Sequence, residues 1–421
     1  MAYYVGSIKD NKVFWNPFQA HNPHLVICGS SGSGKTYSIK QIINTFYKKD
    51  ITFTVIDKHG DIKGDNSNKP IIPLNENILS NSGKKGINPL KASDFEGGLK
   101  ASILSFVSLL NELSAGTKLG HEQENMLYNA IEELYYKNKI TENNYKDTEK
   151  YPDLDDLIRF LKYKYKKTLT GELDAKEFEP LNQLYKEKNK LLRFEKKKAK
   201  AESAENSPEI DQLNEKISKE IDVLVEKYRE YLEKGIINDR DFLIYNSQRS
   251  LLGLINRLSN INKSGVFVKD EISLYNSTVN IKYLDDEQKK IVTYYILSRI
   301  YDYFTNKPIT DTVKHYIIID EASFFMDVPK ITNMIIKIVQ EGRKFGLGVI
   351  LSTQNPLHFH TDILLNTATK IIFAIDPIVY RNVSKSFGVD EKNFNYLKPR
   401  QNCLYSTKSF NNGKYYTLKR D

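Results

Sequence analysis

The sequence is poor in cysteine and has no long apolar run. Only Cys28 and Cys403 occur in 421 residues, which gives neither a disulfide framework nor a zinc site. No apolar stretch approaches the roughly 18 residues of a membrane span, and residues 1–10 lack the apolar core of a signal peptide. These absences exclude a disulfide-stapled secreted domain, and we expect a cytoplasmic protein without a membrane anchor of its own.

Composition and charge leave the class of partner open. The chain is 40% hydrophobic and 27% charged, which is ordinary for a globular protein, and its formal net charge is +9. A moderate positive charge is compatible with a DNA or RNA partner, and equally with a lysine-rich solvated surface. The length suffices for one large domain or two smaller ones.

Strand and helix patterns alternate in residues 1–91 and 276–421, and this alternation predicts a mostly parallel sheet with helices on both faces. We assign these two segments to one α/β core. The expected strands are 24–28, 51–56, 313–319, 347–352 and 370–375, and the expected helices are 35–47, 285–304 and 328–341.

Residues 92–275 lose the strand pattern and carry helical periodicity with many Lys and Glu residues. Apolar residues three or four positions apart over 210–231, preceded by a helical stretch at 181–200, predict a hairpin of two helices. We therefore expect a large all-α insertion that splits the core. A lysine run at 196–198 could contact a phosphate backbone, although such runs are more often solvated helix tips.

Residues 29–36 have the spacing G-x-x-x-x-G-K-[ST] of a phosphate-binding loop. The segment consists of Gly29, Ser30, Ser31, Gly32, Ser33, Gly34, Lys35 and Thr36. Glycines let successive backbone N–H groups point at phosphate oxygens, Lys35 reaches the β- and γ-phosphates, and the Thr36 hydroxyl ligates Mg²⁺. Because a predicted strand precedes the loop and a predicted helix follows it, the motif indicates ATP and Mg²⁺ rather than an unliganded Gly/Ser-rich loop.

An acidic pair, Asp320 and Glu321, ends the apolar strand at 313–319. Asp320 is expected to hold Mg²⁺ directly or through water, and Glu321 to polarise the attacking water as a general base. Alone, such a pair would mark an ordinary strand end, but together with a phosphate loop it predicts ATP hydrolysis. The chain lacks the N-K-x-D motif of GTPases and the Leu-Ser-Gly-Gly signature of ABC ATPases, so we expect neither class.

Three further polar residues are candidates for the same site. Gln354 follows the strand at 347–352 and is expected to sense the γ-phosphate rather than to be a plain polar strand end. Asp57 ends the strand at 51–56, where it either assists the nucleotide and metal or closes a turn. Arg343 follows the helix at 328–341, where it either completes a neighbouring subunit's site or complements the helix dipole.

Together these motifs resemble the HerA/FtsK group of additional-strand P-loop ATPases, nearest to the HerA central domain, with the type IV secretion and conjugation ATPases as relatives. The segments that carry the resemblance are 26–36, 55–61, 87–90, 279–284, 341–346 and 351–356. The resemblance implies a RecA-like core, a homo-oligomeric ring, expected to be a hexamer, with ATP between subunits, and double-stranded DNA in its channel. It also implies that Arg343 is a finger acting on the neighbour, with Arg381 as a weaker candidate.

The chain departs from the family at both ends. HerA proteins usually begin with a small β-barrel that docks a nuclease, whereas here the phosphate loop already begins at residue 29, and no winged-helix domain for sequence-directed translocation is expected before residue 421. We expect an ATP-hydrolysing ring motor that translocates along or remodels double-stranded DNA with a nuclease or other DNA-processing partner. A secretion or conjugation ATPase that moves protein or nucleoprotein, and a nucleotide-gated scaffold, are the alternatives.

Overall fold

The computed structural model forms two compact units. It describes residues 2–49, 51–62, 75–79, 86–92, 97–113, 118–170, 215, 219, 244–263, 265–267, 272–408 and 413–420. The core unit consists of Met1–Lys118, Ile131–Asp155 and Ser259–Asp421, and the helical unit consists of Leu119–Ala130 and Asp156–Leu258. Over the described part of the chain, no helix combines the length and the apolar character that a membrane crossing requires.

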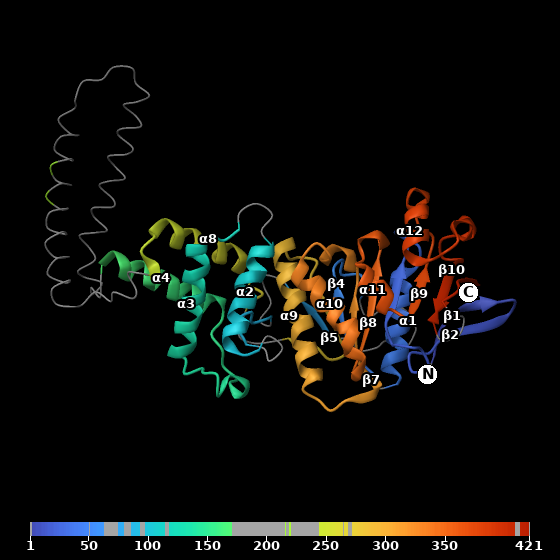
Figure 1. The fold of residues 1–421 in the computed structure, drawn as a ribbon, viewed down its shortest axis with the longest axis horizontal. Helices are drawn as coiled ribbons and strands as arrows, with labels where there is room; N and C mark the ends of the chain where they lie inside the picture. The colour runs from blue at the N-terminus through green and yellow to red at the C-terminus, as the bar shows by residue number, and fades with distance from the viewer. Residues whose placement is uncertain are drawn as a thin grey trace, which may run out of the picture. The chain divides into compact units, whose positions relative to one another are not determined.

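The described residues of the core unit form one 11-stranded sheet (Figure 1). The strands are β1 (Tyr3–Ile8), β2 (Asn11–Trp15), β3 (Leu25–Cys28), β4 (Thr52–Asp57), β5 (Asn75–Ile78), β6 (Ser277–Asn280), β7 (Thr310–Ile319), β8 (Phe345–Thr353), β9 (Thr369–Ile372), β10 (Asn402–Thr407) and β11 (Tyr416–Lys419). Their order in space is β2-β1-β11-β10-β9-β3-β8-β7-β4-β6-β5. The strands from β9 to β5 pair in parallel, whereas β10, β11, β1 and β2 extend the sheet in antiparallel fashion.

The strand order brings the expected motifs to one edge of the sheet. β3 pairs with β8, β8 with β7, and β7 with β4, all in parallel. Their carboxyl ends therefore lie at the same edge, where ligands bind in open α/β sheets. The phosphate loop follows β3, the acidic pair follows β7, Gln354 follows β8, and Asp57 is the last residue of β4.

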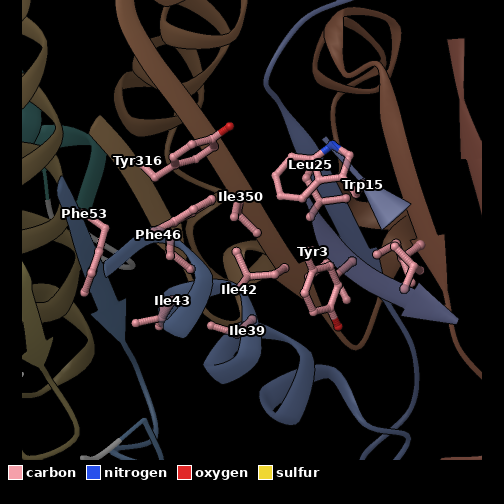
Figure 2. Close-up of a cluster of buried hydrophobic side chains, with 14 of the residues drawn as sticks. Tyr3, Trp15, Leu25, Ile39, Ile42, Ile43, Phe46, Phe53, Tyr316 and Ile350 are labelled. Atoms are coloured by element: carbon pink, nitrogen blue, oxygen red, sulfur yellow. The ribbon is translucent and has the colours of Figure 1, made fainter. Parts of the chain in front are cut away.

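Helices cover this sheet because their apolar residues recur at helical spacing. In the core unit they are α1 (Lys35–Tyr47), α2 (Leu99–Leu113), α9 (Asp286–Thr305), α10 (Pro329–Glu341), α11 (Thr361–Asn366) and α12 (Tyr380–Phe387). Figure 2 shows Ile39, Ile42 and Ile43 of α1 in a buried cluster with side chains of the sheet. Phe46 of α1 stacks on Tyr316 of β7 with ring centroids 4.2 Å apart, which fixes α1 against the strand that leads to the acidic pair.

The expected elements of the core are present, with shifted ends. β7 begins at Thr310 instead of residue 313, and β9 ends at Ile372 instead of residue 375. The α/β P-loop fold is thereby confirmed. The strands β1, β2, β5, β10 and β11 were not predicted, and β6 was indicated only by the family resemblance at residues 279–284.

The insertion contributes helices α3 (His121–Lys137), α4 (Leu154–Thr170) and α8 (Gln248–Asn262). Within the helical unit, the Gln123 side chain donates a hydrogen bond to the Ser250 carbonyl oxygen at 3.0 Å, which ties α3 to α8. The predicted hairpin at 181–200 and 210–231 lies outside the described residues, apart from Glu215 and Lys219.

Candidate nucleotide site

The phosphate loop joins β3 to α1 and has a backbone that only glycine adopts without strain at two positions. Gly32 has φ of 72° and Gly34 has φ of 114°, both in the left-handed region. A third glycine is required by space, because a Cβ at Gly29 would lie 2.5 Å from Ser33 Oγ and 2.7 Å from Phe373 Cβ. The sequence motif therefore corresponds to a tightly wrapped loop at the start of a helix.

Lys35 is held inside this loop. Its Nζ donates hydrogen bonds to the carbonyl oxygens of Gly29 at 2.7 Å and Ser30 at 3.0 Å. Burial lowers the pKa of Lys35, while the nearby carboxylates of Glu321 and Asp320 oppose that shift and favour the charged form. The phosphate loop and the end of β7 are therefore close enough to interact electrostatically, as ATP hydrolysis requires.

Asp320 is buried beside a second carboxylate. Its backbone N–H donates to the Ile56 carbonyl oxygen at 3.0 Å, which aligns it with Asp57 on β4. Burial raises the pKa of Asp320 to about 6, and the carboxylate of Asp57 adds to this shift. Two neighbouring acids in a buried position favour the binding of a cation.

The Glu321 carboxylate links the ends of β7 and β8. Its Oε1 accepts hydrogen bonds from the Ser323 hydroxyl at 2.9 Å and from the Gln354 backbone N–H at 3.3 Å. The Glu321 backbone has φ of 54°, an uncommon conformation for a residue that is not glycine. The general-base candidate and the sensor candidate are thus joined directly, while the Gln354 side chain is exposed.

Asp57 closes a turn with its side chain. Its Oδ1 accepts the backbone N–H groups of His59 at 3.1 Å and Gly60 at 2.8 Å, and its Oδ2 accepts that of Ile62 at 2.8 Å. Of the two roles considered from the sequence, this geometry matches the turn. The negative charge of Asp57 still acts on Asp320.

Arg343 does not lie with the other candidates. It precedes β8, whereas Gln354 follows β8, so the nine residues of that strand separate the two by about 30 Å. Arg343 is exposed, and its guanidinium donates to the His21 carbonyl oxygen at 3.0 Å. Arg381, the weaker candidate, is exposed on α12.

Two arginines that the sequence analysis missed line a pocket of about 460 Å³ beside the phosphate loop. The pocket is lined by Gly32, Gly34, Lys35, Thr36, Tyr37, Arg400 and Arg420. The Arg400 Nε donates to the Gly32 carbonyl oxygen at 3.2 Å, and the Arg420 guanidinium donates to Ser38 Oγ at 2.6 Å. No sequence pattern could have found them, because 368 and 382 positions separate these hydrogen-bonded pairs.

The site fits Mg²⁺ that is bound together with a nucleotide. Among the residues with described positions, no three His, Cys, Asp or Glu side chains gather as a metal site of their own. Mg²⁺ at nucleotide phosphates needs only one or two protein ligands, because phosphate and water oxygens complete its shell. The Thr36 hydroxyl at the start of α1 and the buried Asp320 carboxylate can provide them.

Comparisons with known proteins identify related sequences and folds. The sequence model of the protein family "Helicase HerA, central domain" matches residues 4–300. A curated relative, a probable DNA double-strand break repair helicase HerA from Methanocaldococcus jannaschii, is 37% identical over 81 residues. That alignment spans 18% of this chain and only 16% of the relative.

Two solved structures share the fold over most of this chain. VirB4 of Thermoanaerobacter pseudethanolicus matches with a TM-score of 0.66 and 13% identity, covering 99% of this chain and 96% of VirB4. The plasmid coupling protein TrwB, in complex with a non-hydrolysable ATP analogue, matches with a TM-score of 0.52 and 11% identity, covering 95% of this chain and 87% of TrwB. At these identities the likeness concerns the fold alone.

Proposed function

The chain belongs to the family of the HerA helicase central domain, and from this membership we propose that it is an ATP-hydrolysing motor that assembles as a ring and moves along or remodels double-stranded DNA. One observation carries the proposal. The phosphate loop, the acidic pair and Gln354 follow the carboxyl ends of the adjacent parallel strands β3, β7 and β8, and the Glu321 carboxylate is hydrogen-bonded to the backbone of Gln354. A loop that binds phosphates, a metal-binding acid, a general base and a sensor therefore lie at one edge of the sheet.

Each side chain of this edge has a role in hydrolysis. Lys35 neutralises charge on the β- and γ-phosphates, and Glu321 accepts a proton from the attacking water. Mg²⁺, held by Thr36 and Asp320, would neutralise further phosphate charge. Because the backbone N–H of Gln354 donates to the Glu321 carboxylate, a movement of the end of β8 can be transmitted to the general base.

The position of Arg343 supports a shared active site. The arginine lies about 30 Å from the carboxyl edge of its own sheet, as the length of β8 requires. A guanidinium at that distance cannot contact ATP bound to the same chain. In a ring with head-to-tail contacts, two different surfaces of neighbouring subunits meet, and we propose that this contact brings Arg343 of one subunit to the nucleotide of the next.

A cluster of lysines lies beside the catalytic edge. Phe324 follows Glu321 closely in the chain, and three lysine Nζ atoms surround its ring: Lys58 at 4.1 Å, Lys290 at 5.3 Å and Lys289 at 5.9 Å. Lys290 and Lys289 also form ion pairs with Asp327 and Asp286, at 2.6 Å and 3.4 Å. Because Asp286 and Asp327 offset two of these three charges, the cluster is compatible with a DNA backbone but does not discriminate between DNA and a protein substrate.

A secretion or conjugation ATPase that moves protein or nucleoprotein is the second candidate. Its basis is the resemblance of the sequence motifs to those of the type IV secretion and conjugation ATPases. A nucleotide-gated scaffold is the third candidate. Because the curated relative is a probable DNA double-strand break repair helicase, we expect a nuclease or another DNA-processing protein as the partner.

ATP hydrolysis with and without duplex DNA, measured across a range of salt concentrations, separates these candidates. For a DNA motor we expect a rate that rises with duplex DNA, and a stimulation that weakens steeply with salt, because phosphate contacts release counterions. Hydrolysis that is indifferent to DNA would favour the secretion class, and ATP binding without turnover would favour the scaffold. The mass of the assembly, measured in the same buffers, tests the ring.

A further inference from the structure

The C-terminal hairpin places two arginines next to each other at the phosphate loop. Arg400 lies just before β10 and Arg420 just after β11, and the first described pair of that hairpin is Asn402 with Lys419. The Arg420 backbone N–H donates to the Gln401 carbonyl oxygen at 2.7 Å. The hairpin therefore ends in two neighbouring cations, and both of them line the pocket.

Arg400 is fixed to the loop by backbone and side chain. Its N–H donates to the Ser33 carbonyl oxygen at 3.2 Å, its Nε donates to that of Gly32 at 3.2 Å, and its φ of 64° is rare for an arginine. These contacts use the inner nitrogen of the guanidinium. Within the described residues, its two terminal nitrogens have no protein acceptor at hydrogen-bonding distance. Arg400 thus offers a fork of donors that suits phosphate oxygens.

Arg420 is half-buried among neutral groups. Its guanidinium donates to Ser38 Oγ at 2.6 Å and to the Tyr3 hydroxyl at 3.2 Å, and it lies 5.0 Å from the centre of the Phe373 ring. In the part of the chain that the structure describes, no carboxylate pairs with it. A partly buried charge without a counter-charge is costly unless a ligand provides one.

The location of Arg420 indicates which ligand would provide the negative charge. A Cβ at Gly34 would lie 3.9 Å from an Nη of Arg420, so the guanidinium is next to the N-terminus of α1. Backbone N–H groups of such a loop hold the α- and β-phosphates. Asp320 and Glu321, by contrast, belong to the side where the γ-phosphate is cleaved.

We propose that Arg400 and Arg420 bind the α- and β-phosphates of the nucleotide held by their own subunit. The inference rests on the proposed nucleotide binding and adds two ligand-contacting residues to it. Tyr37, 53% exposed at the same pocket and with its ring 5.8 Å from the Arg420 guanidinium, offers a flat surface for the base. The antiparallel extension of the sheet thus positions Arg400 and Arg420 beside the phosphate loop.

Calorimetric titration of the full chain with MgADP and with inorganic pyrophosphate tests the proposal. We expect Arg400→Gln and Arg420→Gln each to weaken both ligands about tenfold or more, since each removes a charge-assisted hydrogen bond. Pyrophosphate has no base or ribose. If a variant binds pyrophosphate more weakly than the wild type, the substituted arginine therefore contacts phosphate. Lys419→Gln is the matched control, because it removes the same charge from an exposed position on β11 and should keep affinity within about twofold.

The outcomes separate this inference from the proposed function. If the wild-type chain bound neither ligand, both would be overturned. If the wild-type chain bound both and the two arginine variants bound as tightly, only the role of the arginines would be overturned. Should Arg420→Gln fail to fold because Tyr3 and Ser38 lose their contact, Arg400→Gln decides the question alone, since the Arg400 side chain is exposed.

Discussion

Glu321 combines an unusual backbone with a restrained carboxylate. Residues in the left-handed region cost about 1–3 kcal/mol and persist where surrounding contacts enforce them, which is common at functional sites. Here the contacts come from Ser323 and from the backbone of Gln354. The conformation therefore supports a functional role for this acid.

For Glu321→Gln we expect retained nucleotide binding and a turnover that is lower by about 10²–10⁴-fold, the usual contribution of a general base. Glutamine still accepts the hydrogen bonds from Ser323 and Gln354, so the fold around it should be kept. Steady-state ATPase rates together with the dissociation constant for ATP check this. A turnover close to that of the wild type would remove Glu321 from the mechanism.

His315 gives a prediction for the dependence of stability on pH. It is fully buried between the hydroxyls of Thr52, at 2.8 Å, and Thr54, at 3.1 Å, and burial lowers its pKa from 6.5 to about 3. Between these values the unfolded chain binds a proton that the folded chain does not. The free energy of unfolding should therefore fall as the pH decreases below about 6.5.

His315 should lower the free energy of unfolding by about 2 kcal/mol when the pH is decreased from 7 to 5. We expect His315→Gln to lose less stability over this interval than the wild type, as measured by urea unfolding at both pH values. The variant can be less stable at pH 7, so the difference between the two pH values is the quantity to compare. His121→Gln, at an exposed position, should leave that difference unchanged. Equal differences for His315→Gln and the wild type would contradict the prediction.

At the scale of the element, β8 is packed so closely that one of its residues must be glycine. A Cβ at Gly348 would overlap the ring of Tyr316 on the neighbouring strand, and that ring already stacks on Phe46 of α1. The ring has no free space to move into. The packing of β8, β7 and α1 against one another therefore requires that residue 348 has no side chain.

We expect Gly348→Ala to destabilise the core unit by about 1–3 kcal/mol, the usual cost of overpacking. The measurement is the midpoint of thermal or urea unfolding. Gly120→Ala is the control, because a Cβ at Gly120 meets no atom within 4 Å. A Gly348 variant as stable as this control would show that the sheet adapts, contrary to the packing argument.

Strands that are buried on both faces could be predicted from the sequence, whereas polar and exposed strands could not. The runs that became β3, β8 and the last four residues of β7 (Tyr316–Ile319) are mainly apolar and buried because both faces of the sheet are covered there, so they stand out in the sequence. The strand β5 reads Asn-Glu-Asn-Ile, and β11 is exposed except at Leu418. β5 lies at one edge of the sheet, and β11 lies between β1 and β10 in the antiparallel extension. Such polar strands have no apolar pattern of their own, and they form because neighbouring strands provide hydrogen-bond partners.

The candidate site shows the same division. Motif residues close together in sequence, such as those of the phosphate loop, could be assigned from spacing alone. Arg400 and Arg420 could not, because their proximity to the loop results from the antiparallel extension of the sheet. Asp57 was a candidate for the site, with two possible roles, assisting the metal or closing a turn. The sequence could not decide between them, because the backbone N–H groups that its carboxylate binds come together only in the folded turn.

At the scale of the whole molecule, the sheet separates two residues that we propose to act in the same hydrolysis step. Glu321 is at the carboxyl edge and Arg343 at the amino edge, and the length of β8 lies between them. A single subunit therefore has both residues but cannot use both on one nucleotide. If Arg343 takes part in hydrolysis, the complete site must combine two chains.

Mixing two inactive variants tests this directly. Glu321→Gln retains the finger and Arg343→Ala retains the general base. When the finger acts in trans, a contact between the two kinds of subunit is complete in one of its two orders, namely where Arg343→Ala provides Glu321 and Glu321→Gln provides Arg343. In a random equal mixture about a quarter of the sites should be complete, and ATPase activity should return to that fraction. Mass measurement of the mixture confirms that rings form, and each variant alone is the control. If Arg343→Ala is inactive alone and the mixture stays as inactive as its components, Arg343 does not complete a neighbour's site.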